Sequence, residues 1–180
     1  MSTDALRRLT DRESREVWDR FDERFDFKPS MNAFPAITEP VPSVTWSLDA
    51  LHDDPGDRNL DHLVRLVQDG LATCTPPGTA LLVLEWQHTS YRLRPDLPAS
   101  DMFLPDALGG NFRPGWPRSP YPDGDYPVYL AEDLTFGTFG HPWEHSLCVF
   151  GTGLLNEVAA DVGQLLPTVL RRDGQPTTTS

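Results

Sequence analysis

The chain has 180 residues, 38% of them hydrophobic and 23% charged, which is typical of a folded globular protein and excludes a fibrous or disordered one. Its net charge of -12 argues against binding to the phosphate backbone of DNA or RNA, which attracts clustered Lys and Arg. The acidity lies on the main body of the chain, because residues 29–150 contain 6 arginines and 16 acidic residues.

The length suits one domain, which we place at residues 1–174. The first residues lack the basic start and apolar core of a signal peptide, and no run approaches the ~20 apolar residues of a membrane span, so we expect a cytoplasmic protein without membrane contact. Cys74 and Cys148 are too few for a disulfide framework or a cysteine-built zinc site. No phosphate-binding loop or dinucleotide fingerprint is present, and we predict no cofactor.

The first predicted helix covers residues 10–27. Thr10 and Glu13 have the spacing of a capping box, in which each side chain bonds the other residue's backbone N–H. Apolar residues follow at helical spacing until Pro29 ends the pattern.

A short strand is predicted at residues 44–48, with Val44, Trp46 and Leu48 on one face. A second helix is predicted over residues 59–72. Residues 80–84 are apolar on both faces, as in a central strand covered on both sides, and run into the polar end Glu85–His88.

Residues 95–125 are rich in Pro and Gly, so we predict a long loop there, which is a lid, a binding loop or a disordered segment. Further strands are predicted near residues 91–94, 128–131, 136–139 and 147–150, then a helix over residues 153–172 and a disordered tail at residues 175–180. The fold class is therefore α+β: a largely antiparallel sheet of about five to six strands, with the helices packed mainly on one face.

The segment from His141 to His145 reads His-Pro-Trp-Glu-His, the letter pattern of an inverted zinc-protease motif. That chemistry needs both histidines on one helix, whereas Gly140 and Pro142 flank the first histidine and an apolar strand follows at once. We therefore interpret the segment as a corner between two strands. His141, His145, Asp123 and Asp125 remain the weak candidates for metal ligands.

His141 and Glu144 could form an acid–base pair, because a neighbouring carboxylate can orient a histidine and raise its pKa. Glu85 and His88, at the end of another predicted strand, could converge on the same place. In the alternative structural interpretation, Glu144 pairs with an arginine and residues 142 and 143 pack as a corner.

Five segments of the chain resemble an uncharacterised bacterial family of the actinobacterial type, classed as a domain of unknown function. They are Pro42–Trp46, Glu85–His88, Pro122–Tyr126, the Gly-Thr-Phe-Gly-His-Pro-Trp-Glu block at residues 137–144 and the Ser-Leu-Cys-Val-Phe-Gly block at residues 146–151. The resemblance spans roughly residues 15–172. It implies a bacterial origin and a single domain, and it implies no activity, substrate or catalytic residue.

Our leading hypothesis is a module that binds a protein or a small molecule where the 95–125 loop meets the corner. Aromatic side chains would supply contact area, and the polar groups of His or Glu would fix the orientation of the ligand. The predicted contacts are Trp86, His88, His141, Trp143 and Glu144. The alternatives are a small hydrolase or lyase using His141 and Glu144, with or without a metal, and an immunity-like inhibitor of a basic protein.

Overall fold

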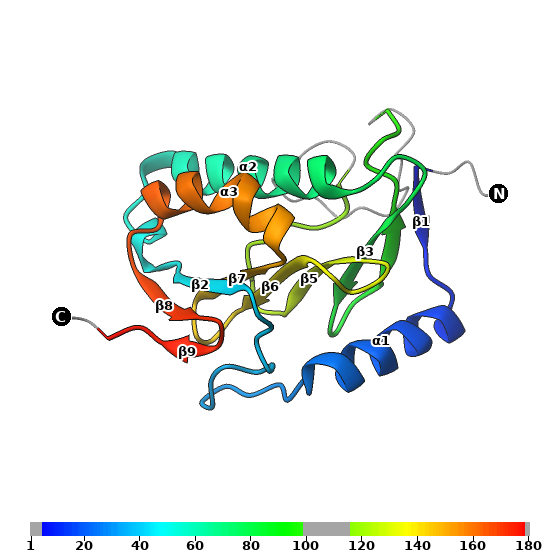
Figure 1. Cartoon of the computed structure of the whole chain (residues 1–180), viewed down its shortest axis with the longest axis horizontal. Coiled ribbons are helices and arrows are strands. Elements are labelled where there is room, and N and C mark those ends of the chain that lie inside the picture. The colour runs from blue at the N-terminus through cyan, green and yellow to red at the C-terminus, as the bar shows by residue number, and fades with distance from the viewer. Residues whose placement is uncertain (1–4, 99–115, 179–180) are drawn as a thin grey trace.

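The computed structural model describes residues 5–98 and 116–178. Within them, one nine-stranded sheet is combined with three α-helices (Figure 1). The helices are α1 (Asp11–Phe25), α2 (Arg58–Cys74) and α3 (Thr152–Leu165), and two short 3-10 turns are η1 (Asp49–Leu51) and η2 (Pro55–Asp57). The strands are β1 (Leu6–Arg8), β2 (Ser43–Ser47), β3 (Leu81–Glu85), β4 (Tyr91–Leu93), β5 (Pro127–Ala131), β6 (Gly137–His141), β7 (Ser146–Phe150), β8 (Val169–Arg172) and β9 (Gln175–Pro176).

The strands follow the order β1-β4-β3-β5-β6-β7-β2-β8-β9 across the sheet, and every neighbouring pair is antiparallel. The predicted α+β class with an antiparallel sheet is therefore confirmed. The predicted number of five to six strands is wrong, because β1, β8 and β9 add short strands at the two edges. Strands of two to four residues carry too little alternation to be found from sequence.

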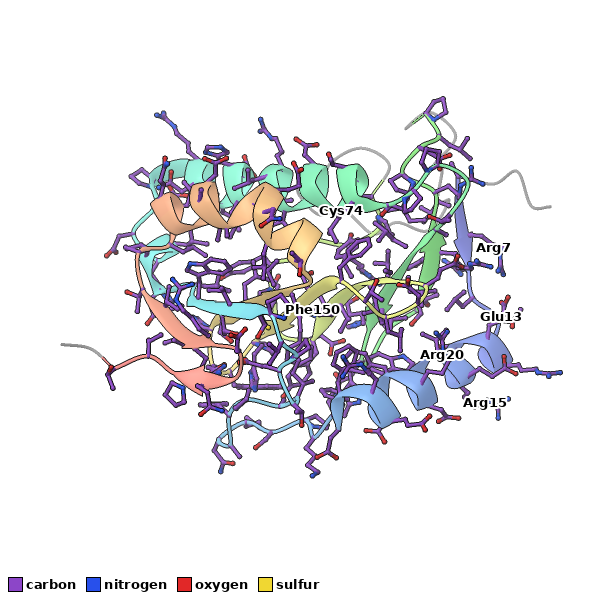
Figure 2. All side chains as sticks on the ribbon, in the orientation of Figure 1. Arg7, Glu13, Arg15, Arg20, Cys74 and Phe150 are labelled. Atoms are coloured by element: carbon purple, nitrogen blue, oxygen red, sulfur yellow. The ribbon has the colours of Figure 1, made fainter. Side chains whose placement is uncertain are left out.

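The helices cover both faces of the sheet, which corrects the prediction that they lie mainly on one face. In Figure 1, α2 and α3 lie on one side of the sheet and α1 lies on the other. Leu81 and Val83 of β3 belong to the core under α2 and α3, whereas Leu82 and Leu84 belong to the core under α1. Side chains fill the space between the sheet and the helices on each face (Figure 2). A strand that is apolar on both faces needs a cover on each, and α1 supplies the second one.

The helix α1 begins with the predicted capping box. The side chain of Thr10 accepts a hydrogen bond from the backbone N–H of Glu13, and the Glu13 carboxylate accepts one from the backbone N–H of Thr10. Phe21 and Phe25 are the fully buried side chains of this helix, and the Phe25 ring lies 5.3 Å from that of Phe150 on β7. The α1 helix therefore packs its apolar stripe on the central strands.

The last predicted helix is too long. Residues 153–172 were expected to be helical, but α3 ends at Leu165 and residues 169–172 form β8 beside β2. Pro167 explains the end, because it has no backbone N–H and disfavours the helical conformation of the residue before it. Residues 175 and 176, which were placed in the disordered tail, pair with β8 instead.

Part of the predicted 95–125 loop, residues 99–115, lies outside the described residues. Just beyond that part, Trp116 is buried and its ring lies 5.5 Å from that of Tyr129. None of the three α-helices, nor any other described helix, combines the length and apolar character required to span a bilayer.

The contact between α2 and α3 depends on Gly70. A Cβ atom added there would lie 2.3 Å from Cγ1 of Val158, a branched side chain that cannot turn away easily. We expect Gly70→Ala to destabilise the protein by about 1–2 kcal/mol, because overpacking outweighs the gain in helix propensity. Gly163→Ala in α3 is the matched control, since nothing lies within 4 Å of its added Cβ, and it should stabilise by up to about 1 kcal/mol. Urea denaturation measures both, and equal effects of the two substitutions would contradict the close helix contact.

Candidate functional site

The segment from His141 to His145 is the tight turn between β6 and β7. His141 is the last residue of β6 and pairs with Ser146, the first residue of β7. His145 has a left-handed backbone conformation, with φ of 52°. The interpretation of this segment as a corner is confirmed, and the two histidines are not on a helix as the zinc-protease motif requires.

His141 is held in a buried and neutral state. The residue is 1% exposed, and its Nδ1 atom accepts a hydrogen bond from the backbone N–H of Glu144 at 3.1 Å. The ring proton of the neutral form therefore sits on Nε2, which has no hydrogen-bond partner among the described residues. Burial lowers the pKa of His141 to about 4, and the nearby carboxylate of Glu144 offsets only part of this effect.

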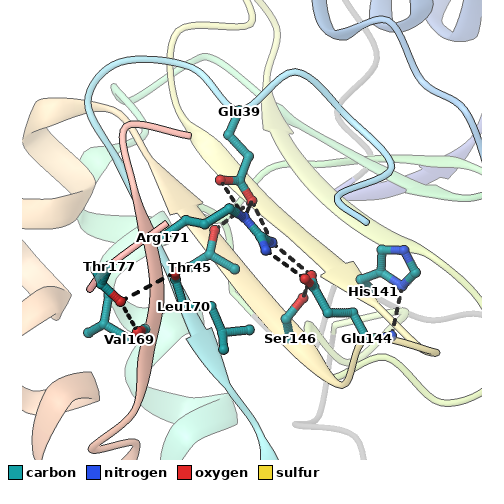
Figure 3. A network of polar contacts seen from close by, with 9 residues as sticks. All are labelled: Glu39, Thr45, His141, Glu144, Ser146, Val169, Leu170, Arg171 and Thr177. Carbon is teal, nitrogen blue, oxygen red and sulfur yellow. Dashed lines mark hydrogen bonds and ion pairs between the residues drawn. The ribbon is translucent and has the colours of Figure 1, made fainter. Parts of the chain in front are cut away.

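Arg171 of β8 binds the carboxylate of Glu144 (Figure 3). The two guanidinium nitrogens Nη1 and Nη2 lie 2.6 and 2.7 Å from its two carboxylate oxygens, and the Ser146 hydroxyl donates to it at 2.6 Å. Burial raises the pKa of Glu144, but the bonds from Arg171 and Ser146 outweigh burial, so the pKa lies below its ordinary value. These contacts agree with the alternative interpretation of the sequence, in which Glu144 pairs with an arginine.

The other side of Arg171 meets a second carboxylate, that of Glu39. The Arg171 Nε atom lies 3.0 Å from both Glu39 oxygens, and the Thr45 hydroxyl donates to the same carboxylate at 2.8 Å. Arg171 stands opposite Thr45 across the β2–β8 pair, so the sheet register brings the network together. The network joins three distant segments of the chain and was missed in the sequence, where residues 171 and 172 were read as the end of a helix.

A second polar group lies at the end of β3. Nδ1 of His88 is 2.8 Å from the buried carboxylate of Asp125 and 3.5 Å from that of Glu85. Nε of Arg118 lies 2.6 Å from the Glu85 carboxylate. Burial raises the pKa of Glu85, and the charge of Arg118 opposes this shift. Glu85 and His88 therefore lie near each other, with Asp125 and Arg118 as partners that the sequence analysis did not assign to them.

Tyr126 connects the β3 end with the corner. Its ring centroid lies 5.0 Å from that of His141, 5.4 Å from that of Trp143 and 5.9 Å from that of Trp86. The Tyr126 hydroxyl donates to the carbonyl of Ser30 and accepts from its N–H, at 3.0 and 2.9 Å. The predicted contact residues Trp86, His141 and Trp143 thus surround one buried ring, which the sequence analysis named only as the end of the segment Pro122–Tyr126.

The exposed apolar side chains gather around this ring. Trp86 is 40% exposed and Trp143 is 37% exposed, and each contacts Tyr126. Phe34 is 45% exposed and stands edge-on to His141 with 4.9 Å between ring centroids, and Met31, which is 68% exposed, follows Ser30. We call Met31, Phe34, Trp86 and Trp143 the aromatic patch. Among the described residues, Val41 is the exposed large hydrophobic residue outside it.

Two groups of described residues place three possible metal ligands within 4.8 Å of one another. One is Glu85 with His88 and Asp125, and the other is Asp49 with His52 and His145. Asp125 and His145, two of the weak metal candidates, therefore fall in separate groups. Asp123 and His141 belong to neither.

The fold and these contacts define a class of protein: a single α+β domain built on a nine-stranded antiparallel sheet, with a buried arginine–carboxylate network beside an exposed aromatic patch. Residues 8–155 match the family described as "Protein of unknown function (DUF2716)", and the chain belongs to this family. The chain is similar to "Uncharacterized protein YxiI" of Bacillus subtilis (strain 168), with 23% identity over 160 residues that cover 86% of this chain and 93% of that protein. No solved structure matches the chain.

These comparisons confirm the resemblance to a bacterial family of unknown function. The actinobacterial type, and the use of residues 137–151 as its signature, stay predictions.

Proposed function

We propose that this protein is a binding module that takes a basic protein partner on the aromatic patch. The observation that carries the proposal is that the exposed Trp86, Trp143 and Phe34 pack on Tyr126 or His141. The exposed Met31 follows Ser30, which binds the Tyr126 hydroxyl. Exposed apolar groups that cluster on one surface mark interaction sites, and Trp and Met are enriched in the cores of protein interfaces.

The patch is held in place before any partner arrives. Both hydrogen bonds of the Tyr126 hydroxyl go to Ser30, so the segment that carries Met31 and Phe34 is tied to the ring beneath it. Phe27 adds a second support, since its ring lies 5.2 Å from Tyr126 and 6.2 Å from Trp86. Side chains that are already ordered lose little conformational entropy on binding, which favours affinity.

Charge favours a basic partner. Two described basic side chains, Lys28 and Arg118, already pair with carboxylates: Lys28 with Asp26 at 2.6 Å, and Arg118 with Glu85 at 2.6 Å. The exposed Asp123 carboxylate adds negative charge near Glu85, on a protein whose net charge is -12. Such a surface attracts a positively charged partner and repels acidic ones. An immunity-like inhibitor of a basic protein would use a surface of this kind.

A protein partner fits these residues better than a small ligand. The chain has a pocket of about 200 Å³ between α1 and the sheet and another of about 300 Å³ beside Cys74 and Phe136, and neither is lined by the aromatic patch. These volumes lie at or below the lower limit of ordinary ligand pockets, about 300 Å³. Neither of these two pockets offers the aromatic patch to a small ligand.

The acid–base alternative draws no support from the contacts of His141 and Glu144. The Glu144 carboxylate is occupied by Arg171 and Ser146, and His141 is hydrogen-bonded to the backbone of Glu144, not to its carboxylate. A general base needs a reachable atom at a suitable pKa, and His141 is buried with a pKa of about 4.

Panning a random-peptide phage library on the full chain tests the proposal. We expect enrichment of peptides that combine Arg or Lys with aromatic or aliphatic side chains. Their affinity should fall more than about tenfold in the double variant Trp86→Ser/Trp143→Ser, because hot-spot tryptophans are each worth about 2 kcal/mol or more.

Val41→Ser is the matched control, because Val41 is 75% exposed and lies outside the aromatic patch. This variant should bind like the unchanged protein. Selected peptides that bind equally to the double tryptophan variant, or that are acidic, would refute the proposal.

A further inference from the structure

Asp49, His52 and His145 form a group that the binding module does not use. His52 and His145 stack with their ring centroids 4.9 Å apart and their planes 14° from parallel. The Nδ1 atom of His52 lies 3.8 Å from Oδ1 of Asp49, and that of His145 lies 3.9 Å from the same oxygen. Two imidazoles and one carboxylate thus place one possible ligand atom each within 4.8 Å of one another.

We propose that this group is a binding site for a divalent transition-metal ion of the zinc type. Hydrogen bonds of this kind require a separation of about 3.2 Å or less, so neither histidine is hydrogen-bonded to the Asp49 carboxylate. Two ligands of one tetrahedral zinc ion lie about 3.3 Å apart, because each bond is about 2.0–2.2 Å long. Each N–O distance therefore needs to shorten by roughly half an ångström, and the distance between the two imidazole ligand atoms, which lies within 4.8 Å, by up to about 1.5 Å.

The backbone holds both halves of the site together. The N–H of Leu48 donates to the carbonyl of His145 at 2.8 Å, and the Ser47 hydroxyl accepts from the N–H of Asp49 at 3.2 Å. The His145 side chain leaves the β6–β7 turn toward η1 because its backbone adopts the left-handed conformation. Only side-chain torsions must adjust: the stacked rings tilt, and Nδ1 of His52 gives up its 3.1 Å contact with the Asp49 carbonyl.

The ligand set selects the class of ion. Neutral imidazole nitrogens suit Zn²⁺, Ni²⁺, Cu²⁺ and Co²⁺, whereas Ca²⁺ and Mg²⁺ prefer oxygen ligands. Three protein ligands leave at least one position for water, and the site is open to solvent, since the side chains of His52 and Asp49 are 55% and 74% exposed.

The group of Glu85, His88 and Asp125 is a weaker candidate for the same role. Its histidine is already hydrogen-bonded to Asp125 at 2.8 Å, and the Glu85 carboxylate already forms an ion pair with Arg118. A metal ion would have to displace these interactions.

A bound ion would tie η1 to the β6–β7 turn, which also carries Glu144 and Trp143. Because the ion would bind the folded state, it should raise the melting temperature.

Titration of the untagged full chain with ZnCl₂ and CoCl₂ tests the site by calorimetry, melting temperature and the visible spectrum of Co²⁺. We expect one ion per chain, a higher melting temperature and a visible Co²⁺ spectrum typical of nitrogen and oxygen ligands, without a thiolate band. His52→Gln and His145→Asn should each weaken binding more than about tenfold, because each removes one of three ligands. Asn tolerates the left-handed conformation of residue 145, so the second variant keeps the turn.

His62→Gln is the control, because His62 is exposed on α2 and belongs to neither metal-ligating group. It should bind like the unchanged chain. Unchanged affinity in both His52→Gln and His145→Asn, a thiolate band that points to Cys74, or no binding at 100 µM of either ion would overturn the proposal.

Discussion

Replacing Arg171 by methionine is expected to destabilise the protein by about 3–5 kcal/mol, the usual cost of removing one partner from a buried ion pair. The side chains of Glu39 and Glu144 are 2% and 10% exposed, and Arg171 supplies the positive charge to both. Without it, two carboxylates remain buried near each other and lose the positive charge that compensates both. Denaturation in urea at pH 7 measures the loss.

Two further variants separate the lost charge from a simple packing defect. Arg172→Met changes the neighbouring exposed residue of β8 and should shift stability by less than about 0.5 kcal/mol. Adding Glu39→Gln and Glu144→Gln to Arg171→Met removes the uncompensated charges and should restore much of the loss. Equal urea midpoints for Arg171→Met and Arg172→Met would show that the network contributes nothing to stability.

Acid should weaken the fold through His141 over a defined range of pH. The pKa of His141 in the folded protein is about 4, and in the unfolded chain it is about 6.5. Between these values the unfolded chain binds a proton that the folded protein does not, so this contribution to stability is complete above pH 6.5 and is lost as the pH falls toward 4. The total loss from this group approaches about 3 kcal/mol.

His141→Asn isolates the effect of this histidine from that of the carboxylates. The Asn side chain can accept the hydrogen bond from Glu144 that Nδ1 accepts, and it does not titrate. We expect the free energy of unfolding of this variant to fall less steeply between pH 6.5 and 4 than that of the unchanged protein. Parallel curves for the two proteins over this range would show that His141 is not held neutral by the fold.

Local sequence signals predicted the elements whose pattern is complete within a few residues. The capping box at Thr10 and Glu13 and the two apolar faces of residues 80–84 are of this kind, and the structure has both. The corner at His141–His145 followed from Gly140 and Pro142, which leave no room for a helix. In each case neighbouring residues decide the conformation.

Contacts between residues that lie far apart in the sequence could not be predicted from local patterns. Glu39, Glu144 and Arg171 meet only because β8 returns along β2. The helix predicted over residues 153–172 ran past Pro167 into the residues that form this strand. Tyr126 likewise becomes central only when β3 and β6 lie on either side of β5. From the sequence, we placed the predicted contact residues Trp86, His141 and Trp143 near one another by assuming that strand ends converge. In the structure each of the three contacts the buried ring of Tyr126.

Hydroxyl-radical footprinting of the chain with and without its tightest selected basic peptide tests the aromatic patch most directly. Mass spectrometry reads the oxidation of each side chain separately. We predict that Met31, Phe34, Trp86 and Trp143 become protected together, while the exposed Val41 is oxidised to the same extent in both samples. Unchanged oxidation of both tryptophans in the complex, with protection elsewhere on the chain, would contradict the proposed binding surface.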